Sequence, residues 1–199
     1  ITLSITPKKY FKGVYVLPLI GDHWVPTSSA ECVNEDADFD GNLDPNEDDG
    51  SATAPDDNDD GVLWPGNVIT VSAGTVTTNE NGFANFEVRY PQQFGNWLEV
   101  DLKASRIVSG TESVNTATFV PPISADDGKT TQSPPGRSYS GPAAVGSPFG
   151  RGANCPSSKF GTTETSCGTI HHMGKQEATP PTVTARNGIV RLTEAIAEG

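Results

Sequence analysis

The sequence has few of the residues that build a large apolar core or a membrane anchor. Only 34% of its 199 residues are hydrophobic, with one Met against 16 Pro and 21 Gly. No apolar run approaches the roughly 18 residues of a membrane-spanning helix, and the start at Ile1 without an initiator Met suits a mature chain that has lost a signal peptide. Many turn formers between short apolar segments argue against a helical bundle and predict an all-β fold.

Basic residues are also scarce, with 13 Lys and Arg against 25 Asp and Glu and a formal net charge of −12. Phosphate binding needs clustered Lys and Arg, so this charge argues against a nucleic-acid partner. Thirteen of the acidic residues lie between Glu31 and Gly61, where there is no Lys or Arg. Such a block repels itself and stays disordered unless a cation or a partner neutralises it.

Cysteine is rare, and Cys32, Cys155 and Cys167 permit three single disulfides. Because short loops close at a lower entropic cost, we favour Cys155 with Cys167, which leaves Cys32 free or joined to another chain. An oxidising, calcium-rich exterior suits both a disulfide and the acidic segment. We therefore expect a secreted or cell-surface protein.

Short segments of alternating apolar and polar residues predict strands. The predicted strands are two short ones within residues 1–26, then residues 68–71, 83–90, 97–108 and 114–120. In the first region we interpret Pro7 and Gly13 as interruptions, whereas Asn81-Gly82 is a strong turn signal because both residues tolerate positive φ. The spacing of about ten residues between strands predicts a sandwich.

The region from 121 to 181 is different, because 9 Pro and 9 Gly in its 61 residues leave hardly any apolar run. Such a segment becomes ordered most easily by wrapping over a domain or by packing against another molecule. Residues 182–199 resemble a terminal hairpin around Asn187-Gly188, although the last arm also fits a short helix. The predicted organisation is residues 1–120 with a calcium-binding insert at 31–67, an extension at 121–181 and a terminal hairpin or strand.

Residues 36–47 match the twelve-residue calcium loop D-x-[DN]-x-[DN]-G-x5-E at every defined position. The predicted metal ligands are Asp36, Asp38, Asp40, the backbone carbonyl of Asn42, Asp44 directly or through water, and both oxygens of Glu47. Gly41 permits the sharp turn, and Leu43 is the apolar anchor that such loops place beside the ion. Without amphipathic helices on either side, the loop fits a structural clip better than a helix-opening sensor.

The pattern partly returns at residues 56–67. Its predicted ligands are Asp56, Asn58, Asp60 and, at the position equivalent to Asn42, the backbone carbonyl of Val62. Asn67 replaces the final Glu, so this second site is weaker or is completed from elsewhere, for example by Asp48 or Asp49. The tandem pattern predicts Ca²⁺ as the cofactor; the alternative is a solvated acidic loop with no bound ion.

The run Thr77-Thr78-Asn79-Glu80-Asn81-Gly82-Phe83-Ala84, followed by a strand that ends at Tyr90 and a strand that contains Trp97, resembles bacterial immunoglobulin-like domains of invasin and intimin type. Those domains share a Thr-Asp-x-x-Gly-x-Ala turn, and Asn79 stands where the family more often has Asp. The acidic insert is similar to dockerin and thrombospondin type 3 calcium repeats. The resemblance covers roughly residues 1–120 and implies an immunoglobulin-like β-sandwich with a structural and adhesive role on the outside of a bacterium, and no reaction.

Other candidates for chemistry are sparse. Cys167, His171 and His172 hold three potential metal ligands within six residues but match no standard zinc spacing, so an exposed His pair is the simpler interpretation. Trp24, Trp64 and Trp97 could form a platform for sugar stacking, although core packing is the favoured role. The sequence contains no hydrolase, haem or phosphate-loop motif, and we expect no enzyme.

The leading functional hypothesis is therefore a calcium-stabilised, extracellular structural subunit of a filament, pilus or surface assembly. Its expected partners are other protein subunits, as a homo-oligomer or filament. Terminal segments such as Thr2–Thr6 or Ile189–Ala197 could complete the sheet of a neighbour by strand exchange. The alternative is a secreted carbohydrate-binding or adhesion module that contacts a surface glycan.

Overall fold

The computed structural model describes residues 1–44, 47, 62–140, 145–153, 155, 171–172, 182–186 and 189–195. Its strands are β1 (Thr2–Val16), β2 (Val25–Val33), β3 (Thr70–Val71), β4 (Phe83–Arg89), β5 (Leu98–Val108), β6 (Thr111–Phe119), β7 (Arg137–Ser138), β8 (Val145–Gly146), β9 (His171–His172), β10 (Thr182–Arg186) and β11 (Ile189–Ala195). One short 3-10 helix, η1 (Gln92–Phe94), precedes β5. The predicted all-β class is confirmed.

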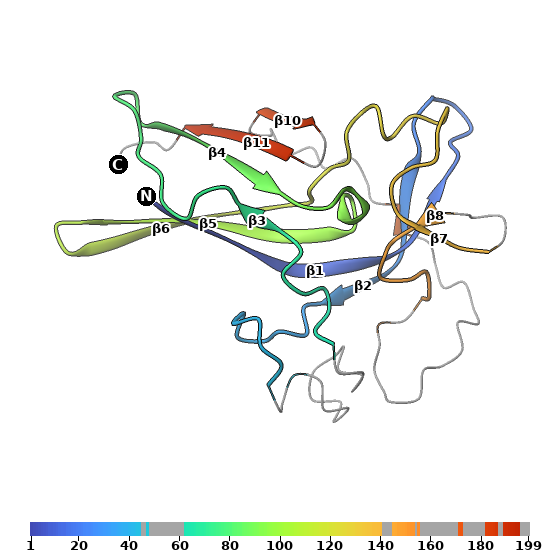
Figure 1. Ribbon diagram of the computed structural model, residues 1–199, viewed down its shortest axis with the longest axis horizontal. Helices are drawn as coiled ribbons and strands as arrows, with labels where there is room; N and C mark the ends of the chain where they lie inside the picture. Colours follow the sequence, from blue (N-terminus) through green and yellow to red (C-terminus); the bar gives the residue numbers. More distant parts are fainter. Residues whose placement is uncertain are drawn as a thin grey trace.

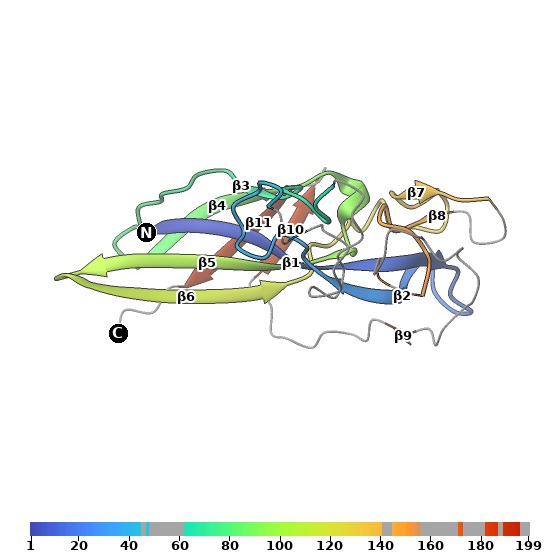
Figure 2. The ribbon, with the colours of Figure 1, turned by 90° about the horizontal axis from the view of Figure 1, so that it is seen from below.

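The strands form two antiparallel sheets. The first has the order β6-β5-β1-β2-β9, with β8 paired to β1 and to β7, and the second has the order β10-β11-β4-β3. Figure 1 shows β1 and β5 along the long axis of the molecule, with β4 and β11 lying above them. In Figure 2, β7 and β8 lie at one end of this axis. The first sheet therefore extends from the region covered by β4 and β11 to the end of the molecule where β7 and β8 lie.

The core lies between the two sheets. On β5, Leu98, Val100 and Leu102 are buried at alternate positions, and Val88 of β4 and Trp97 are also buried in the same cluster. Alternation of this kind is what a half-buried strand requires, since successive side chains point to opposite faces. The strands predicted at residues 83–90 and 97–108 are confirmed.

The prediction of two short strands within residues 1–26 is wrong for β1. Thr2–Val16 is one strand of 15 residues. Its pairing with β5 shifts register between Pro7 and Lys9, and its pairing with β2 shifts between Lys12 and Gly13. A bulge leaves one residue outside the ladder, so a Pro without an N–H or a Gly can stand there without ending the strand. Pro7 and Gly13, which we interpreted as interruptions between strands, therefore lie at bulges within one strand.

The described part of the Pro/Gly-rich extension lies against the two sheets of the same chain. Pro121 accepts a hydrogen bond from Asn96 N (2.7 Å), Ser147 N donates to Gly13 O (3.0 Å), and Phe149 belongs to the core cluster. Wrapping over the fold is thus the arrangement of this part of the extension. At the terminus, β10 pairs with β11 as a strand, not a helix, and β11 pairs with β4.

The cysteine prediction is wrong. Cys32 on β2 forms a disulfide with Cys155, across a sequence separation of 123 residues. Loop-closure entropy favours near neighbours, but it does not include the tertiary packing that brings the extension back beside β2. Ser29 Oγ on β2 accordingly donates to Arg151 O (3.0 Å) and Gly152 O (2.9 Å). Cys167 lies outside the described residues.

The order of the strands gives no support to the immunoglobulin-like prediction. β1 lies between β2 and β5, inside its sheet. In the ABED and CFG sheets of an immunoglobulin domain, the first strand lies at an edge. Among the described residues, no helix is long and apolar enough to span a membrane.

Candidate metal centre

The acidic loop begins directly after β2, which continues to Val33 and so takes up the first residues of the segment expected to form the insert. Within the loop, side-chain carboxylates accept backbone N–H groups. Asp36 Oδ1 accepts from Asp40 N (3.2 Å), Asp36 Oδ2 from Gly41 N (2.9 Å) and Asp40 Oδ1 from Asn42 N (2.7 Å). Asp and Asn readily form such local bonds, which compete with regular structure and curl the chain.

Two residues of the loop have left-handed backbone conformations, Phe39 at φ 62° and Gly41 at φ 79°. This region is open to Gly, whereas an aromatic residue there costs on the order of 1–3 kcal/mol and tends to mark a ligand clamp or a switch. At Gly41 a Cβ would lie 2.4 Å from Nδ2 of Asn67, so the Asn67 side chain would have to move to make room for it. Asn67, the last residue of the second pattern, therefore packs against the turn of the first loop.

The curl brings three predicted ligands together. One carboxylate oxygen from each of Asp36, Asp38 and Asp40 lies within 4.8 Å of the others. Asp36 is buried, at 5% exposure, while Asp38 and Asp40 are exposed. Burial raises the pKa of Asp36 despite the N–H bonds that it accepts, and the nearby charge of Glu47 raises this pKa further. The cluster thus concentrates negative charge at a site where part of it is desolvated.

Glu47 is buried and its carboxylate returns to the start of the loop. Its Oε1 accepts from Ala37 N (2.7 Å) and its Oε2 from Asp44 N (3.1 Å). Desolvation, followed by the charges of Asp40 and Glu47, raises the pKa of Asp44. The predicted ligand set is therefore partly assembled: the three Asp converge, and Glu47 closes the loop through backbone hydrogen bonds.

A second clamp, which the sequence did not indicate, lies at the base of the insert. Glu35 is 2% exposed, its N–H donates to Trp64 O (2.8 Å), and its Oε2 accepts from Trp64 N (2.7 Å). The sequence suggests that Glu35 is solvated, because it lies within an acidic run. Its burial depends on contact with the backbone of Trp64, which is distant in sequence. Glu35 and Trp64, 29 positions apart in the sequence, are thus tied together at the base of the insert.

The second predicted loop is described only in part. Asp56, Asn58 and Asp60 lie outside the described residues, as do Asp48 and Asp49. Val62 is 52% exposed, and Leu43, the expected anchor of the first loop, is 48% exposed. Leu43 is therefore not buried as an anchor would be.

The tryptophans do not share an exposed platform. Trp97 is fully buried, Trp64 packs edge-on against Phe149 with ring centroids 5.6 Å apart, and Trp24 Nε1 donates to Gln132 O (2.8 Å). Core packing, the favoured role, is confirmed for Trp97. His171 and His172 form β9, which pairs with Thr27 and Ser28 of β2; the metal-binding hypothesis for this pair is not tested.

No protein-family model, curated protein or solved structure matches the chain. The resemblance to invasin-type domains and to calcium repeats therefore remains a prediction from the motifs alone. What the site can do follows from its own donors, which are hard carboxylate oxygens held by a network of backbone N–H groups.

Proposed function

We propose that residues 36–47 bind Ca²⁺ and that the ion works as a structural clip in an extracellular structural protein. The observation that carries this proposal is the convergence of the Asp36, Asp38 and Asp40 carboxylates within 4.8 Å. Three carboxylates at this spacing repel one another in a partly buried setting, and a divalent cation between them reverses that cost.

The chemistry of the donors favours calcium over a transition metal. The predicted ligands of this loop are all oxygen atoms, and calcium accepts six to eight of them in flexible geometry, whereas magnesium demands a near-ideal octahedron. An irregular loop with a carbonyl and several carboxylates suits the more tolerant ion. The Cys32–Cys155 disulfide supports an oxidising compartment, where calcium is also abundant.

A structural role in an assembly is supported by the surface of the first sheet. Among the described strands β6 is the last at its edge, it contains no Pro and a single charged residue, Glu112, over nine residues, and its pairing with β5 has no bulge. Isolated domains usually protect such edges with charges, prolines or bulges.

Both segments predicted to exchange between subunits, Thr2–Thr6 and residues 189–197, contribute to strands paired within the same chain, β1 with β5 and β11 with β4. The proposed assembly therefore does not require strand exchange.

The alternative of a carbohydrate-binding module has no specific observation in its favour among the described residues, because Trp97 is fully buried and Trp24 and Trp64 pack against the core cluster. An immunoglobulin-like classification is likewise not needed for the proposal. The function proposed here depends on the acidic loop and on the surface of the sheets.

Isothermal titration of the metal-free protein with CaCl₂ tests the calcium site. We expect binding that is weakened at least about tenfold by Glu47→Gln, because one of the two carboxylate oxygens that close the loop is lost. Glu112→Gln on the exposed edge strand makes the same change of charge and is the matched control. Absence of calcium binding, or equal weakening by both variants, would reject the proposed site.

A further inference from the structure

The turn between β1 and β2 presents aliphatic side chains to solvent. Leu17, Leu19 and Ile20 are 63%, 104% and 93% exposed, and they lie within four successive residues. A contiguous apolar group of this kind is unusual on a monomer and marks a contact site. We call Leu17–Ile20 the apolar tip.

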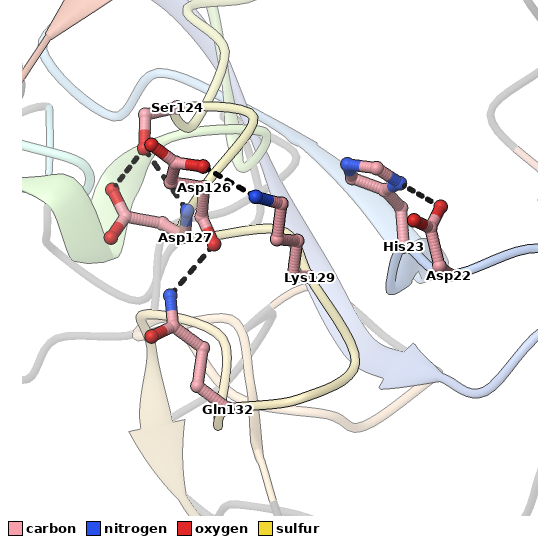
Figure 3. A network of polar contacts seen from close by, with 7 residues as sticks. All are labelled: Asp22, His23, Ser124, Asp126, Asp127, Lys129 and Gln132. Atoms are coloured by element: carbon pink, nitrogen blue, oxygen red, sulfur yellow. Dashed lines mark hydrogen bonds and ion pairs between the residues drawn. The ribbon is translucent and has the colours of Figure 1, made fainter.

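The base of the apolar tip is held firmly although its side chains are free. Trp24 N donates to Gly128 O (2.7 Å), and Thr130 N donates to Asp22 O (2.8 Å). Figure 3 shows the supporting network, in which Lys129 pairs with Asp126 (2.7 Å) and Gln132 Nε2 donates to Asp126 O (2.7 Å). The tip is thus preorganised, which reduces the entropy lost when it docks.

A groove lies between the two sheets near the start of β1. Its walls are mainly apolar and include Leu3, Val76, Phe86, Leu102, Ala104 and Ala117. It holds about 60 Å³, enough space for a few water molecules. Polar residues of β5 and β6, Arg106 and Asn115 among them, line the groove beside this apolar wall.

The apolar tip and the groove are at opposite ends of the same strand. Leu3, near the start of β1, lines the groove, and Leu17 directly follows the last residue of β1. Figure 1 shows β1 running from the N-terminus toward the turn at the other end of the molecule. With a rise of about 3.3 Å per residue, the two sites are on the order of 40 Å apart, so a tip cannot reach the groove of its own chain.

We infer that the apolar tip of one copy inserts into the groove of a second copy, in a head-to-tail contact. Polarity matches, because the aliphatic side chains of the tip meet a mainly apolar wall. Charge also matches: Asp22, with an 81% exposed carboxylate beside the tip, would approach Arg106 at the groove.

The geometry of this contact sets the form of the assembly. Two different surfaces meet, so the contact is heterologous and leads to a ring or an open chain rather than to a two-fold symmetric dimer. The inference rests on the proposed role as a subunit of an assembly, and it names the partner and the contact. It does not depend on the identity of the metal.

Sedimentation velocity of the full chain in calcium buffer, over a series of concentrations, tests the contact. Leu19→Glu on the tip and Asn115→Trp in the groove are each expected to raise the midpoint concentration of association at least about tenfold. Their matched controls are Leu19→Met, which keeps an apolar side chain, and Thr116→Trp, which points to the opposite face of β6. Both controls should associate like the wild type.

A mixture of the two interface variants gives the sharpest outcome. Leu19→Glu keeps its groove and Asn115→Trp keeps its tip, so an equimolar mixture should form pairs of two chains and nothing longer. If the wild type associates but both variants do so equally well, the tip–groove contact is wrong and the assembly stands. If the wild type stays monomeric at every concentration, both the contact and the proposed assembly are rejected.

Discussion

Tyr15 and Tyr90 are buried phenols in the core between the sheets, at 3% and 6% exposure. Desolvation raises the pKa of Tyr15 to about 12, and it also raises the pKa of Tyr90. Because the folded pKa lies above the unfolded value near 10, these groups contribute full stability below pH 10 and lose it as the pH rises toward 12.

We therefore predict that unfolding by urea becomes easier between pH 10 and pH 12. Absorbance titration of phenolate should show fewer tyrosines ionising near pH 10 in the folded protein than in 6 M guanidinium, of the four in the chain. Ionisation of all four near pH 10 without loss of folded structure would contradict the burial of these rings.

Single residues differ in how far the sequence reveals their role. Asn79 was part of a predicted turn, and its Oδ1 accepts from Asn81 N and Phe83 N, both at 3.0 Å. The Asn79 side chain therefore caps the turn before β4. Glu35 was not predicted, because its role depends on Trp64, which is distant in sequence and adjacent only after folding.

At the scale of elements, β2, β1 and β8 approach one another closely at Gly13 and Gly146. A Cβ on Gly13 would lie 2.1 Å from Thr27 O, and one on Gly146 would lie 2.2 Å from Gly13 O. Gly13 also has a φ of 156° at the bulge between β1 and β2. These positions let three backbones pack without side chains between them.

We predict that Gly13→Ala destabilises the protein by about 1–3 kcal/mol, through overpacking against backbone atoms that cannot move aside. The free energy of unfolding in urea measures this loss. Gly74→Ala is the control, since nothing lies within 4 Å of its added Cβ, and it should stay within about 0.5 kcal/mol of the wild type. Equal effects of the two substitutions would contradict the bulge geometry.

Strands in which apolar and polar residues alternate clearly were predictable from the sequence, whereas the bulges within strands were not. Leu98, Val100 and Leu102 repeat with period two, and this local signal suffices to locate β5. Pro7 and Gly13 have the appearance of strand ends, because the sequence does not reveal whether such a residue lies in a turn or at a bulge. That distinction depends on the partner strand.

The disulfide is a second feature of the elements that only tertiary structure reveals. We predict that a non-reducing digest links the Cys32 peptide to the Cys155 peptide, in keeping with the contacts of Arg151 and Gly152 with Ser29 of β2. Because the bond closes a long loop, Cys155→Ser should lower the free energy of unfolding by about 4 kcal/mol. A Cys155–Cys167 peptide in the digest would contradict this pairing.

At the scale of the whole molecule, segments far apart in sequence complete both sheets. β8 joins β1, and β11 joins β4, although the chain between them is rich in Pro and Gly. Local periodicity cannot predict which strands become neighbours, so the sequence indicated the all-β class without the order of the strands. The convergence of Asp36, Asp38 and Asp40 was predictable, by contrast, because these residues are close together in the chain.

The acidic insert is where the account depends most on an ion. The hydrogen bonds of Glu47 and Glu35 tie the loop and its base, but they leave the like charges of Asp36, Asp38 and Asp40 close together. We predict that Ca²⁺ offsets this repulsion and thereby stabilises the folded protein as a whole.

Thermal unfolding in millimolar CaCl₂ and in excess chelator tests this claim most directly. At calcium concentrations about a hundredfold above the dissociation constant, binding adds about 2.7 kcal/mol, which for a chain of this size corresponds to a rise in Tm of roughly 5–10 °C. Glu47→Gln should lose most of this rise, whereas Glu112→Gln should keep it. A wild-type Tm that is the same with calcium and with chelator would contradict the account.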